Sequence, residues 1–447
     1  MYFNRTIDHA LHTWKEDLDR KPLLIRGARQ VGKSSSVRNL GEQFDNFLEV
    51  NFEEMPRLKQ LFERDLNPHR ITEALSVYFG KPIQSGNTLL FFDEIQTCPA
   101  AISSLRFFYE KMPDLHLVAA GSLLEFALHS LPSYGVGRVR SLFMYPFSFD
   151  EFLNAIGENV LVLAKQKANF DQPLETILHD KLLDYLRFFL LIGGMPESVA
   201  FYVKHRQLHK SQQVLDDIYT ALRADFTKYK DTVPPNRLRM VFESVVQQAG
   251  AKFIYAKAVD NTSHYHIKEA LDLLNMAGWV IPVTHTAANG LPLGAEANFK
   301  KRKMLLLDTG IFQRILGLDI SDSLLGDSMS SIHQVALAEQ FWGLEYLKYA
   351  NPWSPPSLYY WHREAASANA EVDYIISQGN KILPVEVKSS GSGRMQSLRQ
   401  FLIEKKQAFG FRFSTENFSS YESIKCFPLY AISNISKNGL TSPEFKQ

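Results

Sequence analysis

The fold is decided by a stretch near the N-terminus that runs LLIRGARQVGKSS from Leu23 to Ser35. Its apolar start predicts a buried strand, and its continuation matches the pattern G-x-x-x-x-G-K-[ST] in full. In such a P-loop, the glycines let backbone N–H groups surround phosphates at the N-terminus of the next helix. Lys33 is expected to act catalytically on the β- and γ-phosphates, and the Ser34 hydroxyl is expected to bind Mg²⁺. The residues expected to bind the nucleotide are Gly27, Ala28, Arg29, Gln30, Val31, Gly32, Lys33, Ser34 and Ser35.

A second apolar run, residues 89–92, ends in two carboxylates, Asp93 and Glu94. A strand that is buried on both faces has this composition. Behind a P-loop, Asp93 is expected to hold Mg²⁺, directly or through water, and Glu94 is expected to polarise the attacking water. Without the P-loop, the same pair would be equally typical of a turn at the end of a strand.

Two further residues are candidates for catalysis. Ser122 follows the apolar run 117–120, where a polar side chain senses the γ-phosphate or positions the water; the alternative is an N-cap of the next helix. Arg138 lies in the segment YGVGRVR at 134–140. An arginine from a neighbouring subunit stabilises charge in phosphoryl transfer, which would require a homo-oligomer. The alternative for Arg138 and Arg140 is that both are solvated.

Short apolar segments alternate with helical segments over the first ~145 residues, which predicts an α/β fold with a parallel sheet. Strands are expected at 23–26, 47–52, 88–93, 115–120 and 142–145. Residues 148–229 have mostly helical patterning, and Pro234-Pro235 marks a boundary. Between 236 and 307, three helical pieces precede two β-like pieces, which is the order of a winged helix-turn-helix. Further strands are expected near 359–361, 372–376 and 382–387.

Five segments of the chain together resemble a family of bacterial and archaeal AAA-type P-loop ATPases that carry a C-terminal domain of unknown function. They are GARQVGKS (27–34), FFDE (91–94), GVGR (135–138), FMYPFSFDEF (143–152) and GGMPE (193–197). The resemblance extends to about Lys388. It implies ATP binding, a helical lid, a winged helix and a nuclease-like C-terminal fold. We therefore expect an ATPase core at 1–147, a lid at 148–233, a winged helix at 234–307 and a restriction-endonuclease-like α/β domain at 308–447.

A β-hairpin is predicted between residues 371 and 388, because Gly379-Asn380 is a two-residue turn signal. Alternation along its strands places the four charged residues nearest its open end on one face. Pro384 donates no ladder hydrogen bond, which predicts an edge position or a local break. The expected cross-strand pairs are Gln378–Lys381, Asp373–Glu386 and Glu371–Lys388.

Like charges opposite each other in a sheet are unfavourable, and a bound cation relieves their repulsion. Asp373 and Glu386 are therefore expected to hold Mg²⁺, which takes oxygen ligands. Lys388 is expected to act catalytically by orienting a water or stabilising negative charge. This D…E-x-K pattern resembles that of restriction-endonuclease-like nucleases, and the resemblance implies an acidic metal ligand on an earlier helix, which Glu339 fits. The alternatives are a solvated strand face and an inert binding module.

The basic run from Lys300 to Lys303 lies where the tip of a wing is expected. Contact with DNA phosphates is the corresponding hypothesis. The alternatives are a solvated basic loop and contact with the ATPase domain.

The composition bounds the class of protein. Of 447 residues, 45% are hydrophobic and 22% charged, as in ordinary globular proteins, and the net charge of +1 excludes a chain that is basic throughout. Two cysteines argue against a disulfide framework. No apolar stretch suits a signal peptide or a membrane span, so a cytoplasmic protein without membrane contact is expected. Two hypotheses remain: an ATP-dependent DNA-processing enzyme, and a nucleotide-gated switch or remodelling ATPase with a docking module.

Overall fold

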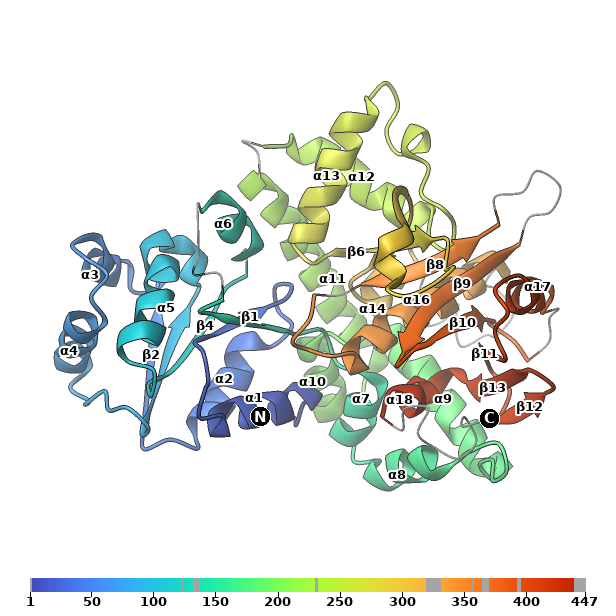
Figure 1. The fold of residues 1–447 in the computed structure, drawn as a ribbon, viewed down its shortest axis with the longest axis horizontal. Helices are drawn as coiled ribbons and strands as arrows, with labels where there is room; N and C mark the ends of the chain where they lie inside the picture. The colour runs from blue at the N-terminus through green and yellow to red at the C-terminus, as the bar shows by residue number, and fades with distance from the viewer. Residues whose placement is uncertain are drawn as a thin grey trace. The chain divides into compact units, whose positions relative to one another are not determined.

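The structure of the chain is a computed structural model (Figure 1), which describes residues 2–122, 124–131, 135, 137–229, 232–318, 331–355, 357–363, 370–391 and 395–437. The chain divides into two compact units. The first unit comprises Met1–Pro146, Met276–Gly278 and Asn351–Pro355, and the second comprises Phe147–Asn275, Trp279–Ala350 and Pro356–Gln447. Within the described residues, no helix has both the length and the apolarity needed to cross a bilayer.

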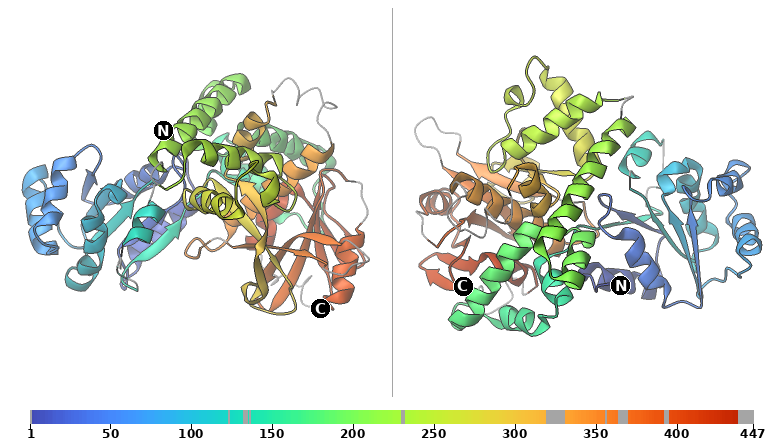
Figure 2. Two further views of the ribbon diagram at one scale, coloured as in Figure 1. Left: turned by 90° about the horizontal axis from the view of Figure 1, so that it is seen from above. Right: turned by 180° about the vertical axis from the view of Figure 1, so that it is seen from behind.

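The first unit is built on a five-stranded parallel sheet with the order β2-β3-β4-β1-β5, drawn from blue to teal in Figures 1 and 2. All five predicted strands are present, so the α/β prediction is confirmed for this unit. The strands are β1 Leu23–Arg26, β2 Asn46–Asn51, β3 Thr88–Asp93, β4 His116–Ala120 and β5 Arg140–Phe143. The helices are α1 Thr6–Glu16, α2 Lys33–Gly41, α3 Gln60–Glu63, α4 Pro68–Phe79, α5 Pro99–Lys111 and α6 Leu124–Ser130.

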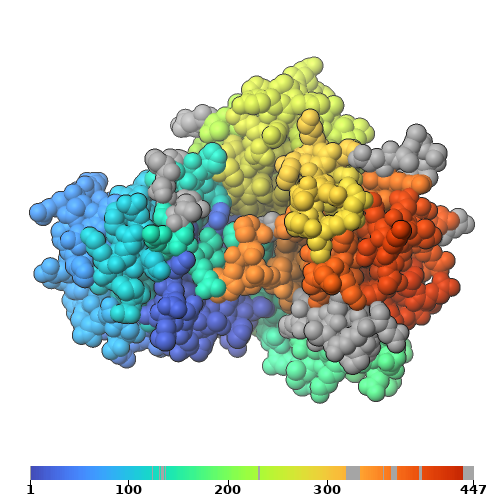
Figure 3. All heavy atoms as spheres, viewed as in Figure 1, coloured from blue at the N-terminus to red at the C-terminus, as the bar shows by residue number. Residues whose placement is uncertain are grey.

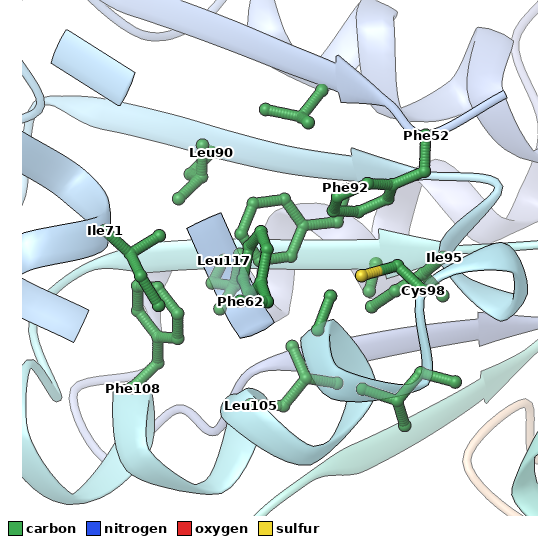
Figure 4. Packing of buried hydrophobic residues seen from close by; sticks show 14 of the residues in the cluster. Phe52, Phe62, Ile71, Leu90, Phe92, Ile95, Cys98, Leu105, Phe108 and Leu117 are labelled. Atoms are coloured by element: carbon green, nitrogen blue, oxygen red, sulfur yellow. The ribbon is translucent and has the colours of Figure 1, made fainter. Parts of the chain in front are cut away.

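Strand β3 is buried along its whole length, and aromatic packing holds its carboxyl end in place. The rings of Phe52, Phe62 and Phe108 meet the ring of Phe92 edge-on, at centroid distances of 5.7, 5.6 and 6.0 Å (Figure 4). Aromatic pairs in this geometry add to the free energy gained from burial. Because Asp93 directly follows Phe92, this packing also fixes where its carboxylate lies.

The second unit contains a mixed eight-stranded sheet with the order β12-β13-β11-β10-β9-β8-β6-β7. The helices between 149 and 225 confirm the predicted helical patterning of this region. The strands are β6 Val280–Thr286, β7 Ala297–Leu306, β8 Leu358–His362, β9 Glu371–Gln378, β10 Lys381–Val387, β11 Gly410–Ser414, β12 Ser419–Tyr421 and β13 Ile424–Pro428. The helices are α7 Phe149–Ala155, α8 Asn159–Lys167, α9 Thr176–Ile192, α10 Pro196–His205, α11 Leu208–Asp225, α12 Pro235–Gln247, α13 His264–Met276, α14 Thr309–Ile315, α16 Ser331–Tyr349, α17 Gln396–Glu404 and α18 Ile432–Lys437.

The predicted winged-helix order is present in the chain: α12, a 3₁₀ turn at Tyr255–Lys257 and α13 precede the antiparallel strands β6 and β7. Strand β6 also pairs in parallel with β8. One sheet therefore crosses the boundary that we placed between residues 307 and 308. The division into lid, winged helix and nuclease-like domain stays a prediction.

The hairpin of β9 and β10 has the predicted register next to its turn, with Gln378 opposite Lys381. The ladder continues without a shift to Val385 opposite Tyr374. Of the two alternatives predicted for Pro384, the edge position is wrong, because β10 lies inside the sheet, between β9 and β11. A local break is present on the side of β11. Pairing of β10 with β11 begins only at Val385, so the missing N–H of the proline falls just outside that ladder.

The GGMPE segment helps to pack the second unit. Gly193 has a φ of +67°, and a Cβ at this position would lie 2.0 Å from Asp308 Oδ1. Asp308 Oδ2 accepts a hydrogen bond of 2.6 Å from Gly194 N–H, and Oδ1 accepts from the first N–H groups of α14. Asp308 thus joins the end of α9 to the start of α14, and only glycine fits at 193.

Candidate nucleotide site and carboxylate cluster

The P-loop connects β1 to α2 with backbone conformations that require glycine at two positions. Gly27 has a φ of +147°, and a Cβ there would lie 2.2 Å from Met144 O. Gly32 has a φ of +99° and precedes the first residue of α2, Lys33. The loop therefore leads directly into a helix N-terminus, where free backbone N–H groups favour phosphate binding.

The ammonium of Lys33 lies inside the P-loop. Its Nζ donates hydrogen bonds to Gly27 O at 2.9 Å and to Ala28 O at 2.7 Å. Burial lowers the pKa of Lys33 to about 8, against the opposing effect of Glu94 and Asp93. Two carbonyl oxygens only partly offset the loss of hydration of this charge. Anionic oxygens, such as those of a phosphate, would therefore stabilise the ammonium further.

Asp93 and Ser34 meet although they belong to different strand–helix units. Ser34 Oγ donates to Asp93 Oδ2 at 2.9 Å. Burial raises the pKa of Asp93 to about 6. A hydroxyl and a carboxylate next to a P-loop are oxygen ligands of the kind that Mg²⁺ takes in nucleotide sites, so these two residues fit the ion that the motif implies.

Glu94 is held by two neighbours, of which sequence reasoning identified only one. Glu94 Oε2 accepts hydrogen bonds from Ser122 Oγ at 3.0 Å and from Gln96 Nε2 at 2.7 Å. The Ser122 hydroxyl is therefore directed at Glu94. Gln96 was missed; its only signal is an amide two residues after the Asp-Glu pair. Gly121 gives it room, because a Cβ at 121 would lie 2.0 Å from Gln96 Oε1.

Arg138, the candidate for a role in a neighbouring subunit, has a half-exposed side chain. Its Nε lies 3.3 Å from Glu110 Oε1. Arg140 pairs with Asp17 at 3.3 Å and stacks on the Trp353 ring. The structure brings neither arginine to the P-loop contacts described above, and the role of Arg138 stays a prediction.

In the second unit, the D…E-x-K residues do come together. Asp373 Oδ2 accepts a hydrogen bond of 2.8 Å from Val387 N–H, and Lys388 Nζ lies 2.5 Å from Glu386 Oε1. Glu339 of α16 is buried beside β9, since Tyr374 donates from its hydroxyl to Glu339 O at 2.8 Å. The helix and both strands thus direct their carboxyl groups to one place.

That place contains a cation that the sequence did not assign to it. The ammonium of Lys303, from β7, lies 3.2 Å from Glu339 Oε2 and 3.7 Å from Asp373 Oδ1, and it also contacts Glu371. Burial opposes the charge on Lys303, but the surrounding carboxylates outweigh it and raise its pKa well above its ordinary range. Burial also raises the pKa of Glu339 to about 8, and that of Glu386 to about 7.

This arrangement does not fit the Mg²⁺ that the D…E-x-K pattern implies. The ammonium of Lys303 already uses oxygens of Glu339 and Asp373. In the described part of the chain, no group of three or more His, Cys, Asp or Glu side chains is placed to hold a metal ion. The metal roles of Glu339, Asp373 and Glu386 stay predictions that this geometry disfavours.

The burial of the basic run on β7 rises along the strand, from an exposed Lys300 through partly buried residues to a buried Lys303. Lys300 is exposed, whereas Lys303 is only 4% exposed and points inward. Arg302 is partly buried and lies 3.8 Å from Asp272 Oδ1 of α13. The expectation of four basic side chains at a wing tip was therefore wrong for Lys303.

Three family models match the chain, in sequence order. The first is described as an AAA domain and covers residues 19–153, which include the P-loop, Asp93 and Glu94. The second and third are domains of unknown function, DUF8612 over residues 183–322 and DUF4143 over residues 335–432. No curated protein matches the chain. The chain thus carries an N-terminal AAA domain, which makes it an ATP-binding and ATP-hydrolysing protein of the P-loop type, followed by two domains of unknown function.

Proposed function

We propose that this protein is a nucleotide-gated switch, in which the first unit hydrolyses ATP and the second unit responds without cutting a substrate. The observation that carries the first part is the meeting of Ser34 with Asp93 beside the P-loop, with Glu94 next in the chain. These residues supply a phosphate-binding loop, a metal-binding pair and a base within one site.

Each residue has a role in the proposed reaction. Lys33 exchanges its two carbonyl partners for oxygens of the β- and γ-phosphates. Ser34 and Asp93 would hold Mg²⁺, and the ion would supply positive charge beside the phosphates. Glu94 takes a proton from the attacking water while the water oxygen forms a bond to the γ-phosphorus. The bond from the γ-phosphorus to the bridging oxygen breaks, and ADP and inorganic phosphate are released. Ser122 and Gln96 are positioning residues, since they orient Glu94.

The experiment compares phosphate release and nucleotide binding by the wild type and Glu94→Gln. General bases contribute roughly 10²- to 10⁴-fold to rates. We therefore expect kcat to fall by about 10²-fold or more, with binding of a fluorescent ATP analogue retained. A kcat equal to that of the wild type would remove Glu94 from the role of base.

The DNA-processing hypothesis has one structural observation in its favour. Strand β7 presents the exposed side chains of Phe299 and Lys300, and the hairpin to which it belongs, drawn in yellow, lies at the surface in Figure 3. An aromatic ring beside basic residues suits nucleic acid. DNA binding that weakens with salt and is lost in Lys300→Ala would support this hypothesis. ATP turnover that no nucleic acid alters would support the switch.

A further inference from the structure

Lys303 is an almost fully buried lysine whose ammonium is surrounded by acidic groups. Its Nζ lies 3.2 Å from Glu339 of α16 and 3.7 Å from Asp373 of β9, and it contacts Glu371 of β9. In the sheet, β6 and β8 separate β7 from β9, so the side chain reaches beyond its neighbouring strand. The ring of Tyr360 on β8 lies 5.5 Å from Nζ and adds a cation–π contact. Three carboxylates and one ring thus stabilise a single buried charge.

This ammonium and a divalent ion compete for the same oxygens. Glu339 and Asp373 are two of the three carboxylates that the D…E-x-K pattern assigns to a metal. Because Mg²⁺ binds oxygen at about 2.1 Å, an ion held by both would stand within a few ångströms of Nζ. At that separation, two positive charges repel strongly in a buried site. Lys303 and a metal therefore exclude each other.

Glu386, the third carboxylate that the D…E-x-K pattern assigns to a metal, is only partly bonded. Glu386 is 5% exposed, and its Oε1 is bound by Lys388. Its Oε2 is buried and has no hydrogen-bond partner. Leaving a buried carboxylate oxygen without a donor is unfavourable, so this atom marks a position where a positive ligand would be stabilised. The ammonium of Lys303 contacts Glu339, Asp373 and Glu371, whereas Oε2 of Glu386 has no hydrogen-bond partner.

We propose that Lys303 is the resident cation of this cluster, and that it keeps divalent metal out of a ligand set that would otherwise hold one. The inference concerns the second unit alone and does not depend on ATP hydrolysis. With the ammonium in place, the three carboxylates are not arranged to hold a metal ion. Removing it would free Glu339 and Asp373 to close, together with Oε2 of Glu386, on Mg²⁺ or Mn²⁺. The chain as it stands is then free of metal-dependent chemistry at this place because its own lysine occupies it.

The test is a titration of the nucleotide-free, full-length protein with Mn²⁺, in which the free ion is counted by electron paramagnetic resonance. The variants are Lys303→Met, Asp373→Asn and the two combined. Lys348→Met is the matched control, since the side chain of Lys348 is only 8% exposed and its Nζ lies 3.2 Å from a single carboxylate, that of Glu345. We expect Lys303→Met to bind one more Mn²⁺ than the wild type, and the double variant and the control to bind no more than the wild type.

Two results would overturn the proposal. One is a folded Lys303→Met protein, judged by circular dichroism, that binds no additional Mn²⁺. The other is wild-type protein that binds one more Mn²⁺ than Asp373→Asn, since the metal would then bind with Lys303 in place. If Lys303→Met does not fold, the comparison of the wild type with Asp373→Asn decides: equal binding supports the exclusion of metal, and unequal binding refutes it.

Discussion

Lys33 in the first unit and Lys303 in the second are both buried, yet burial has opposite outcomes for them. The ammonium of Lys33 bonds to two backbone carbonyl oxygens, and its pKa is lowered to about 8. The ammonium of Lys303 contacts carboxylates, and its pKa is raised. The hydrogen-bond partners given for the first ammonium are neutral carbonyl oxygens, whereas the second ammonium is in direct contact with carboxylates.

This difference in bonding partners explains why a lysine and nearby carboxylates have different roles in the two units. In the first unit, Asp93 bonds to Ser34 and Lys33 bonds to carbonyls, so lysine and carboxylate do not neutralise each other. Lys33 can then bind a phosphate of the substrate, and Asp93 can bind the metal ion. In the second unit, Lys303 and the carboxylates satisfy each other. The carboxylates of the second unit therefore have a cation that the protein itself supplies.

The largest expected effect separates these two roles. Lys33→Ala should abolish ATP binding or hydrolysis, because no other side chain replaces its charge at the phosphates. It should leave thermal unfolding nearly unchanged, since only hydrogen bonds to carbonyls are lost. Phosphate release, binding of a fluorescent ATP analogue and a melting curve measure the three quantities. Normal turnover in this variant would refute the assignment of the P-loop.

Lys303→Ala is expected to lower the stability of the second unit and to leave ATP turnover nearly unchanged. Removing one partner of a buried ion pair destabilises a protein by roughly 3–5 kcal/mol, because an uncompensated charge remains. The measurement is thermal unfolding of the second unit, with ATP turnover as the reference for the first. Lys300→Ala on the same strand is the matched control, and an exposed site of this kind changes stability by only about 0.5 kcal/mol. Equal stability of the two variants would contradict the contrast between Lys33 and Lys303.

A smaller effect is expected from the positioning of Glu94. Gln96→Leu and Ser122→Ala each remove one donor to Glu94 Oε2. We expect kcat to fall on the order of 10-fold in each, since loss of a hydrogen bond to a charged group corresponds to about 1.5 kcal/mol or more. KM should change little, because neither residue belongs to the P-loop. In the background of Glu94→Gln the two substitutions should have almost no further effect, and additive losses would argue against positioning.

The smallest effect concerns His116 on β4, a buried base with no carboxylate bound to it. Its Nε2 donates to Lys15 O at 3.1 Å, and its buried Nδ1 has no partner. Burial lowers its pKa to about 4. Between pH 6.5 and 4 the unfolded chain takes up a proton that the folded chain does not, so stability is lost as the pH falls through this window. We expect a loss on the order of 1 kcal/mol, which His116→Gln should reduce; an unchanged pH profile in that variant would exclude His116 as its source.

The sequence by itself determined the features that depend on short stretches of chain. The P-loop follows from local spacing, because glycines at 27 and 32 are needed for its backbone, as their positive φ angles show. The apolar run before Asp93 predicted a fully buried strand, and β3 is one. The turn at Gly379-Asn380 set the register of its hairpin, because a two-residue turn leaves no freedom in the pairing next to it.

Only the tertiary structure decided which charges meet. Lys303 was expected at a wing tip because the sequence shows four consecutive basic residues, and nothing local shows which of them faces inward. Its burial depends on β7, α16 and β9 converging from distant parts of the chain. The same holds for the contact of Ser122 with Glu94 and for the pairing of β6 with β8. Such contacts depend on packing in three dimensions, since they join elements that are far apart in sequence.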